Sequence, residues 1–273
     1  MTTLFNPARD FRLRADNPHR VLAFYKDRLV VKTTEAGAEI PTSEALAMAG
    51  LEAGPQLCLG TRQNHTYCGW EMRHAPDLPK GLALIGLRAL FGRLDDVDFQ
   101  VAGYAMQLLN WVADNRHCGR CGNKMILEEG ERALICDVCR NSLYPRISPA
   151  IIVAITSGHR LLLARSGRFP GRRMFSVIAG YVEPGETLED CVRREISEEV
   201  GLEVRHIRYF GSQAWPFSGS LMIGFTAEHA GGRITVDGKE ISEADWFTRD
   251  RLPEIPGKIS IARQLIDWFV ENH

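Results

Sequence analysis

The sequence has no long apolar segment and no excess of charge of one sign. Its longest apolar run, 150–155, is far shorter than the roughly 20 residues that a membrane-spanning helix needs. With 33 basic and 34 acidic residues the formal net charge is -1, so no overall attraction to nucleic acid or to anionic membranes is expected. Residues 1–17 also lack the apolar core of a secretory signal. We therefore expect a cytoplasmic protein that does not bind membranes, in which any nucleic acid is bound locally.

Cysteine is too scarce, and odd in number, for a disulfide framework. The chain has seven cysteines. Four of them form two C-x-x-C pairs: Cys118 with Cys121, and Cys136 with Cys139. Two turns at this spacing present four thiolates to one tetrahedral zinc ion, and Gly119 and Gly122 stand where such turns need positive φ. Four thiolates leave no coordination position for water, so we expect one structural Zn2+ per chain without His117 as a ligand.

The remaining composition predicts a globular protein of more than one unit. Hydrophobic residues make up 45% and charged residues 25%, the balance of a chain that buries a core. Residues 1–116 mix short β-like runs with a helical pattern over 95–114, which predicts a mixed α+β domain. Residues 117–144 form the predicted zinc ribbon. Residues 148–273 alternate strand and helix patterns, which predicts an α/β domain. No internal repeat is visible.

Acidic residues gather on one side of a predicted helix over 187–200, which Thr187 is placed to cap. Glu195, Glu198 and Glu199 are spaced i, i+3 and i+4, so they share a face. Like charges at this spacing destabilise a helix by a few tenths of a kcal/mol, and a divalent cation would reverse that sign. Magnesium and manganese prefer carboxylate oxygens and often bridge to phosphates. The pattern therefore predicts a metal site for phosphate substrates.

The surroundings of these carboxylates favour a site over a merely solvated acidic face. The apolar stripe of the helix includes Cys191 and Ile196, and the acidic patch borders this stripe instead of lying opposite it. Arg194 is placed to pair with Glu198 four residues on. Upstream of the helix, 180–185 begins and ends in glycine, which fits a loop whose backbone approaches a ligand closely.

These residues resemble the Nudix box, G-x5-E-x7-R-E-U-x-E-E-x-G-U, in which U is a bulky apolar residue. Every defined position matches: Gly180, Glu186, Arg194, Glu195, Ile196, Glu198, Glu199, Gly201 and Leu202. The resemblance implies an α/β/α Nudix sandwich with a mixed sheet from about Ser148 to the C-terminus. It also implies hydrolysis of a nucleoside diphosphate linked to another moiety.

A second segment, 212–222, bears on the substrate. It places two aromatic rings, polar groups and a proline in what we expect to be one short loop, where the rings stack on a base or belong to the core beside an ordinary turn. It resembles the S-Q-P-W-P-F-P-x-S segment of NADH pyrophosphatases, a family in which a four-cysteine ribbon also precedes the Nudix domain. The chain departs from that pattern at Ala214 and Ser218, where the family has proline. We expect these departures to loosen the loop and to affect base selectivity.

The resemblance also implies roles for individual residues. More than one Mg2+ or Mn2+ ion per site would be bound by Glu195, Glu199, Glu240 and the carbonyl of Ala179, with Glu198 close by. Glu199, Glu198 and Glu195 are the catalytic residues, and Glu199 is the most costly to remove. The implied substrate contacts are Tyr181, Gln213, Ala214, Trp215, Pro216, Phe217, Ser218, Gly219, Ser220, Ala262, Tyr144 and, from a partner subunit of a homodimer, Arg88.

The expected reaction is attack of a metal-activated water on the pyrophosphate of NAD(H), releasing AMP and nicotinamide mononucleotide. The family is also linked to removal of NAD caps from RNA 5′ ends. A basic segment would hold RNA phosphates or form a solvated loop; it contains Arg160, Arg165, Arg168, Arg172 and Arg173. Two alternatives remain open. One is a Nudix hydrolase that prefers ADP-ribose or another dinucleotide. The other is a zinc-ribbon nucleic-acid-binding regulator with a ligand-sensing Nudix domain, against which the intact glutamates argue.

Overall fold

A computed structural model describes residues 5–9, 11, 19–51, 54, 56–167 and 173–273. The chain forms two compact units, Met1–Arg146 and Ile147–His273. The first unit contains both the predicted N-terminal domain and the ribbon. Among the described residues, the helices are too short or too polar to cross a membrane.

The second unit is built on a six-stranded mixed sheet. Its strands are β11 (Ser148–Ser157), β12 (Arg160–Ser166), β13 (Ile178–Tyr181), β14 (Leu202–Trp215), β15 (Ser220–Gly232) and β16 (Ile241–Thr248). The order is β14-β15-β11-β12-β16, with β13 added on β11. Strands β11 and β15 run parallel and the other pairs run antiparallel. The predicted mixed sheet is confirmed.

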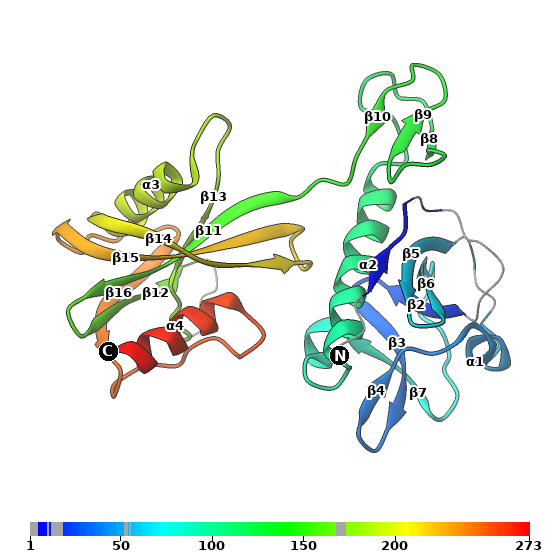
Figure 1. Ribbon diagram of the computed structural model, residues 1–273, viewed down its shortest axis with the longest axis horizontal. Helices are drawn as coiled ribbons and strands as arrows, with labels where there is room; N and C mark the ends of the chain where they lie inside the picture. Colours follow the sequence, from blue (N-terminus) through cyan, green and yellow to red (C-terminus); the bar gives the residue numbers. More distant parts are fainter. Residues whose placement is uncertain (1–4, 10, 12–18, 52–53, 55, 168–172) are drawn as a thin grey trace. The chain divides into compact units, whose positions relative to one another are not determined.

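Two helices cover the two faces of this sheet (Figure 1). On one face Ile151 and Val153 pack in one core cluster with the buried side of α3 (Leu188–Val200). On the other face Ile152 packs with α4 (Ile261–Asn272). Neighbouring residues of β11 therefore point to opposite layers, as the two-residue period of a strand requires. The α/β/α sandwich is confirmed.

The helix boundaries follow the capping residues of the sequence. The Thr187 hydroxyl accepts a hydrogen bond from the Asp190 amide at 3.2 Å, and Gly201 ends α3 with φ 67°. The hairpin that follows differs from expectation. Strands β14 and β15 extend to Trp215 and Ser220, so the segment expected to be a loop is the end of a β-hairpin with a short turn at 216–219. Because β15 pairs with β11 from Ser220 onward, the strand includes residues whose types are typical of loops.

The first unit contains a second sheet. Its elements are β1 (Asn6–Pro7), β2 (His19–Tyr25), β3 (Arg28–Thr34), β4 (Gly37–Glu39), α1 (Ser43–Met48), β5 (Gln56–Arg62), β6 (His65–Glu71), β7 (Leu82–Gly86), η1 (Leu87–Leu90) and α2 (Asp96–Asp114). Asp95 caps α2 at the predicted start, and its carboxylate accepts from the amides of Val97 and Asp98. The ribbon then adds β8 (Met125–Leu127), β9 (Leu134–Cys136) and β10 (Ser142–Leu143).

The sheet of the first unit repeats the topology of the second, although the sequence shows no repeat. The path β5-β6-β2-β3-β7 corresponds to β14-β15-β11-β12-β16. In both units the central pair, β2 with β6 or β11 with β15, is parallel, and its neighbours are antiparallel. In each unit one helix, α1 or α3, precedes the second hairpin. Another helix, α2 or α4, follows the last strand. The differences are local: α1 has 6 residues whereas α3 has 13, and β4 pairs with β3 whereas β13 pairs with β11.

Candidate active site and zinc centre

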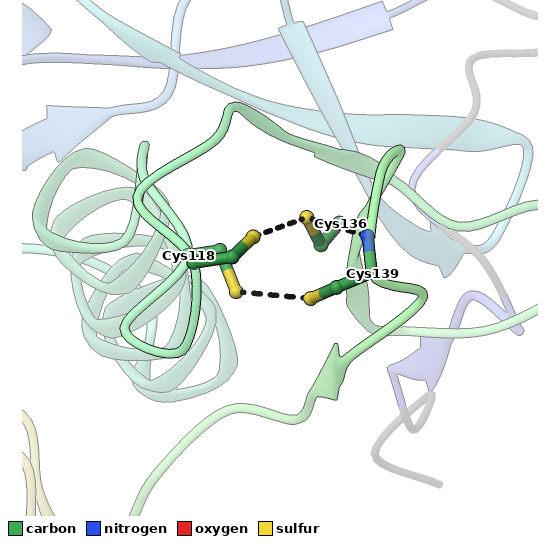
Figure 2. Close-up of side chains that lie close together, drawn as sticks. Cys118, Cys136 and Cys139 are labelled. Atoms are coloured by element: carbon green, nitrogen blue, oxygen red, sulfur yellow. Dashed lines mark hydrogen bonds between the residues drawn. The ribbon is translucent and has the colours of Figure 1, made fainter.

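The four cysteines of the two C-x-x-C pairs form one cluster. Their sulfur atoms all lie within 4.8 Å of one another. Sγ of Cys118 lies 3.7 Å from Sγ of Cys139, and Sγ of Cys121 lies 3.5 Å from Sγ of Cys136. Figure 2 shows the first of these pairs pointing toward each other. A tetrahedral ion with metal–sulfur bonds of about 2.3 Å holds its sulfurs about 3.8 Å apart, so the cluster fits zinc.

The two halves of this centre are near copies of each other. The amide of Gly122 donates to the Cys118 carbonyl at 2.8 Å, and the amide of Arg140 donates to the Cys136 carbonyl at 3.1 Å. Both donors have positive φ, 75° and 56°. The expectation for Gly122 is confirmed, whereas the one for Gly119 is wrong because its φ is not positive. The second turn places an arginine where the first has glycine.

Hydrogen bonds to sulfur favour the charged form of the first cysteine pair. The Arg120 amide donates to Sγ of Cys118 at 3.4 Å, and the Asn123 side-chain amide donates to Sγ of Cys121 at 3.5 Å. The hydrogen bonds from Asn123 lower the pKa of Cys121 to about 6. Backbone hydrogen bonds, first from Arg120, also lower the pKa of Cys118. Zinc binds the thiolate, so these hydrogen bonds prepare the first of the two turns for the metal.

The Nudix-box carboxylates line a cavity of about 650 Å³ in the second unit. It lies between β13, α3, the β14–β15 hairpin and the segment before β16. The lining residues are Ala150, Ala179, Gly180, Tyr181, Glu183, Arg194, Glu195, Glu198, Glu199, Trp215, Ser218, Ser220, Met222, Asp237, Lys239 and Glu240. The predicted metal-binding set therefore shares one cavity with Tyr181 and Trp215, two of the aromatic residues predicted to contact the substrate.

Arg194 links the carboxylates of this cavity. Its guanidinium makes a bidentate contact with Glu186, from Nε to Oε1 at 2.7 Å and from Nη2 to Oε2 at 2.9 Å. Nη1 also lies 2.9 Å from Oε1 of Glu195 and 3.1 Å from Oε2 of Glu198. The predicted pair with Glu198 is present, but the bidentate partner, Glu186, was not foreseen. The Arg194 hydrogen bonds lower the pKa of Glu186 to about 2.

The burial and charge of the glutamates fit a divalent cation. Glu199 is 7% exposed and is the one charged residue among those classed as buried in the described part of the chain. Burial raises the pKa of Glu195, and the carboxylates of Glu198 and Glu240 act in the same direction, while Arg194 opposes them. Clustered carboxylates in a partly desolvated cavity repel one another, and hard cations with oxygen preference relieve that repulsion.

The two glycines upstream of α3 have different functions. Gly185 has φ 87° with open space around it, so it is needed for the turn. Gly180 lines the cavity, but what lies against it is the side chain of Glu195. The expectation that both glycines bring backbone close to a ligand is therefore incomplete, because Gly180 also makes room for a carboxylate.

The aromatic side of the cavity contains a chain of hydroxyl groups. Tyr181 is 52% exposed, and its hydroxyl lies 3.1 Å from Oγ of Ser220. Oγ of Ser220 in turn lies 2.8 Å from Oγ of Ser218. Trp215 packs edge-on against Phe217, with ring centroids 5.0 Å apart. Of the rings expected to stack on a nucleotide, those of Tyr181 and Trp215 thus belong to cavity-lining residues, whereas Phe217 does not line the cavity.

Several predicted substrate contacts lie outside this lining, namely Gln213, Ala214, Pro216, Phe217, Gly219 and Ala262. Gln213 donates from Nε2 to the Ile259 carbonyl at 2.8 Å and accepts from the Ile261 amide at 2.7 Å. Its amide thus ties the hairpin to the start of α4. Ala262 is 7% exposed and packs in the core cluster beside α4. Their contact with substrate stays a prediction.

The first unit holds the two remaining predicted contacts. Tyr144 follows β10 and is 57% exposed, and Arg88 lies in η1. Both roles stay predictions.

The basic segment is partly committed to contacts within the protein. Arg165 pairs with Glu243 at 3.0 Å, and Arg160 lies over the ring of Trp246. Arg173 lines a separate cavity together with Arg165. The expected residues Arg168 and Arg172 lie outside the described residues. A role in holding RNA phosphates stays a prediction.

Asp237 and Lys239 are among the lining residues to which the sequence interpretation gave no role. The Asp237 carboxylate accepts from the amides of Glu240 at 2.9 Å and Ile241 at 2.8 Å, so it shapes the turn that presents Glu240. Lys239 adds a positive charge beside the carboxylates. The Asp237–Gly238 dipeptide is a turn signal that would have drawn attention to this segment.

Comparison with known proteins decides the family. A model described as NUDIX domain matches residues 146–269, an NADH pyrophosphatase-like rudimentary NUDIX domain matches 18–111, and an NADH pyrophosphatase zinc ribbon domain matches 113–144. The NAD-capped RNA hydrolase NudC of Pseudomonas fluorescens is 44% identical over 236 residues, which are 86% of this chain and 80% of that protein. The chain belongs to the NudC family of Nudix hydrolases.

Other relatives agree with this membership. NudC of Stutzerimonas stutzeri is 48% identical over 202 residues, 74% of this chain and 72% of that protein. A NUDIX hydrolase crystal structure from Nitrosomonas europaea shares the fold, with a TM-score of 0.51 and 24% identity over 58% of this chain and 92% of that one. The rudimentary NUDIX match also accounts for the repeated topology of the first unit. As a NudC-family Nudix hydrolase, the chain uses divalent metal and carries structural zinc in its ribbon.

Proposed function

We propose that this chain hydrolyses the pyrophosphate of NAD(H) to AMP and nicotinamide mononucleotide, oxidised or reduced, and removes the NAD cap from RNA 5′ ends. The supporting observation is a single cavity lined both by the aromatic side chains of Tyr181 and Trp215 and by the Nudix glutamates. A dinucleotide needs both, because its rings stack on aromatic faces while its pyrophosphate requires cationic compensation. The names of the NudC relatives support the same substrates.

The roles of the residues follow from their positions. Tyr181 and Trp215 bind and orient a ring of the substrate, and Lys239 attracts its phosphates. Magnesium or manganese, more than one ion per site, would be held by Glu195, Glu198, Glu199, Glu240 and the Ala179 carbonyl. Such ions lower the pKa of water and neutralise charge on the pyrophosphate.

Arg194 and Glu199 complete this machinery. Arg194 fixes Glu195 and Glu198 in place through its fork of hydrogen bonds. The buried carboxylate of Glu199 holds the proton taken from the attacking water. Removing its negative charge while keeping its size therefore tests the proposal directly.

Assembly and location are part of the proposal. A homodimer in which Arg88 of one subunit and Tyr144 contact the nucleotide fits the family resemblance. Reduced thiols in the ribbon fit the cytoplasm, where disulfides are rare.

The test is a substrate panel of NADH, NAD-capped RNA and ADP-ribose, with magnesium, with manganese or with neither, for the wild type and Glu199→Gln. We expect metal-dependent AMP and nicotinamide mononucleotide from NADH, a 5′-monophosphate RNA from capped RNA, and a loss of about 10²-fold or more in kcat for the variant. Cleavage of ADP-ribose alone would overturn the NAD assignment and leave a Nudix pyrophosphohydrolase. Absence of all cleavage by folded, metal-loaded wild type would favour the ligand-sensing regulator.

A further inference from the structure

Tyr181, Ser220 and Ser218 form a hydroxyl chain in the cavity, and the residue at one end, Ser218, departs from the family motif. Ser218 stands where NADH pyrophosphatases have proline. Its hydroxyl lies 2.8 Å from that of Ser220, which lies 3.1 Å from that of Tyr181. Ser220 is 1% exposed, so water has little access to its hydroxyl. A buried hydroxyl without partners is costly, and these two neighbours satisfy it.

Ser218 also provides a backbone contact that proline lacks. Its amide donates to the carbonyl of Trp215 at 3.4 Å, closing the turn between β14 and β15. Proline would supply a fixed φ in place of this hydrogen bond. The serine therefore replaces one form of rigidity with another, and its side chain adds a link from the turn to Tyr181.

We propose that Ser218 and Ser220 act as positioning residues that set the orientation of the Tyr181 ring and with it the affinity for the nucleotide. This proposal rests on the proposed function, in which Tyr181 stacks on the substrate. Tyr181 is on β13 and the two serines are in the β14–β15 hairpin, so the hydroxyl chain joins two elements that both line the cavity. A half-exposed ring is otherwise free to rotate, and the contact with Ser220 restricts it.

The hydroxyl chain has a second consequence, for substrate specificity, which follows from counting its hydroxyl protons. Three hydroxyls have three protons, and the two hydrogen bonds between them use two. One O–H therefore remains. It belongs to Ser218 or Tyr181 if Ser220 donates to a neighbour, and to Ser220 if Ser220 accepts from both, and all three residues line the cavity. The remaining donor suits a phosphate or ribose oxygen of the substrate. A proline at 218 would have no donor to offer there.

The first experiment observes Tyr181 without relying on catalysis. In protein labelled with 3-fluorotyrosine, the 19F resonance of Tyr181 is assigned by its loss in Tyr181→Phe. Ser220→Ala is expected to shift this resonance, and Ser218→Ala to shift it less, while Ser157→Ala on the far end of β11 leaves it unchanged. An unchanged Tyr181 resonance in folded Ser220→Ala would overturn the proposal whatever the enzyme hydrolyses.

The second experiment separates binding from chemistry with NADH. We expect Ser218→Ala and Ser220→Ala to raise KM about three- to tenfold, the range for one lost hydrogen bond, with kcat within about twofold of wild type. Ser218→Thr keeps the hydroxyl on an exposed turn and is expected to retain the wild-type KM. Tyr181→Phe combined with Ser220→Ala is expected to cost no more than either change alone.

The outcomes separate this inference from the proposed function. A loss in Ser218→Thr equal to that in Ser218→Ala, or additive effects of Tyr181→Phe and Ser220→Ala, would overturn the role of the hydroxyl chain while NADH hydrolysis stands. If wild type does not cleave NADH but the 19F shifts occur as expected, the proposed substrate fails and the positioning of Tyr181 stands. Thermal unfolding identifies any variant that fails to fold. In that case the 19F resonance of Tyr181 is compared between the remaining folded variants and Ser218→Thr, and this comparison decides whether the hydroxyls position the ring.

Discussion

A Cβ atom at Gly180 would lie 1.9 Å from the carboxyl carbon of Glu195. The glycine on β13 thus leaves a space that the carboxylate on α3 fills. Its backbone is not in the positive-φ region, so what excludes a larger residue is the neighbouring side chain and not the conformation. Gly180, the first glycine of the Nudix box, therefore leaves the room that the Glu195 carboxylate occupies.

Gly180→Ala is expected to displace Glu195 with little loss of stability, because the end of a flexible side chain can move away. We expect kcat to fall about 10²-fold, as for misplaced catalytic groups, with a nearly unchanged unfolding temperature. Gly185→Ala is the matched control. Its surroundings are open but its φ is 87°, so we expect a loss of about 1 kcal/mol in unfolding free energy and a smaller effect on kcat. Steady-state kinetics and thermal unfolding of both variants check this, and equal kcat values would contradict it.

The Glu186–Arg194 pair is expected to make stability depend on pH under acidic conditions. The pKa of Glu186 is lowered from 4.5 to about 2 by the Arg194 hydrogen bonds, so the carboxylate contributes stability above its unfolded pKa. That contribution is lost as the pH falls from 4.5 toward 2. The difference in unfolding free energy between wild type and Glu186→Gln is therefore expected to shrink over this window. Denaturant unfolding at several pH values measures it.

Arg194→Leu provides the control for this prediction. Without the guanidinium, Glu186→Gln is expected to have a smaller pH-dependent effect over the same window, because only the Glu183 amide, at 3.0 Å, still lowers the pKa of Glu186 strongly. A difference that shrinks by the same amount in the Arg194→Leu background would show that Arg194 does not cause it.

Arg140→Gly is expected to strengthen the zinc ribbon. Arg140 has φ 56° in the second cysteine turn, where a side chain strains the backbone, whereas Gly122 occupies the equivalent place in the first. We expect a gain of about 0.5–1 kcal/mol in resistance to unfolding by a zinc chelator. Gly122→Ala should lose a comparable amount. Zinc release into a colorimetric chelator at rising concentration measures both, and identical release from wild type and Arg140→Gly would refute the strain.

Gln213→Leu is expected to destabilise the junction between β14 and α4. Both ends of the Gln213 amide are hydrogen-bonded to backbone, at Ile259 and Ile261, and leucine satisfies neither. We expect a loss of about 1 kcal/mol in unfolding free energy, as for partly buried groups that lose their hydrogen bonds. If Gln213 instead contacts substrate, the loss will be in KM with unchanged stability. Ala214→Leu, on the neighbouring exposed position, controls for the larger side chain.

Local signals in the sequence were sufficient to predict α3. Thr187 and Gly201 bound α3 where capping chemistry requires, and Glu199 lies beside the core as the helical pattern indicates. The cysteine pairs likewise predict their own cluster, because four ligands at that spacing have one common solution. In both cases the partners that define the feature lie close together along the chain.

Features that depend on distant partners were not visible. The hairpin end at 212–222 was expected to be a loop because its serines, glycine and proline are turn residues. Residues 212–215 are strand because they pair with β15, and 220–222 pair with β11 as well. Gln213 has a polar side chain suited to ligand or backbone, and its partners Ile259 and Ile261 lie far along the sequence. Arg194 forms its bidentate contact with Glu186 across the turn before α3, beyond the helical spacing that the sequence pattern considers.

The repeated topology gives the chain an internal reference for separating structural requirements from catalytic ones. Thr42 and Thr187 start the corresponding helices α1 and α3, and each accepts a hydrogen bond at 3.2 Å from the amide three residues on. What the two units share in this way serves folding. The acidic surface of α3 has no counterpart in the shorter α1, so one scaffold persists in the first unit without the chemistry that the second unit adds to it.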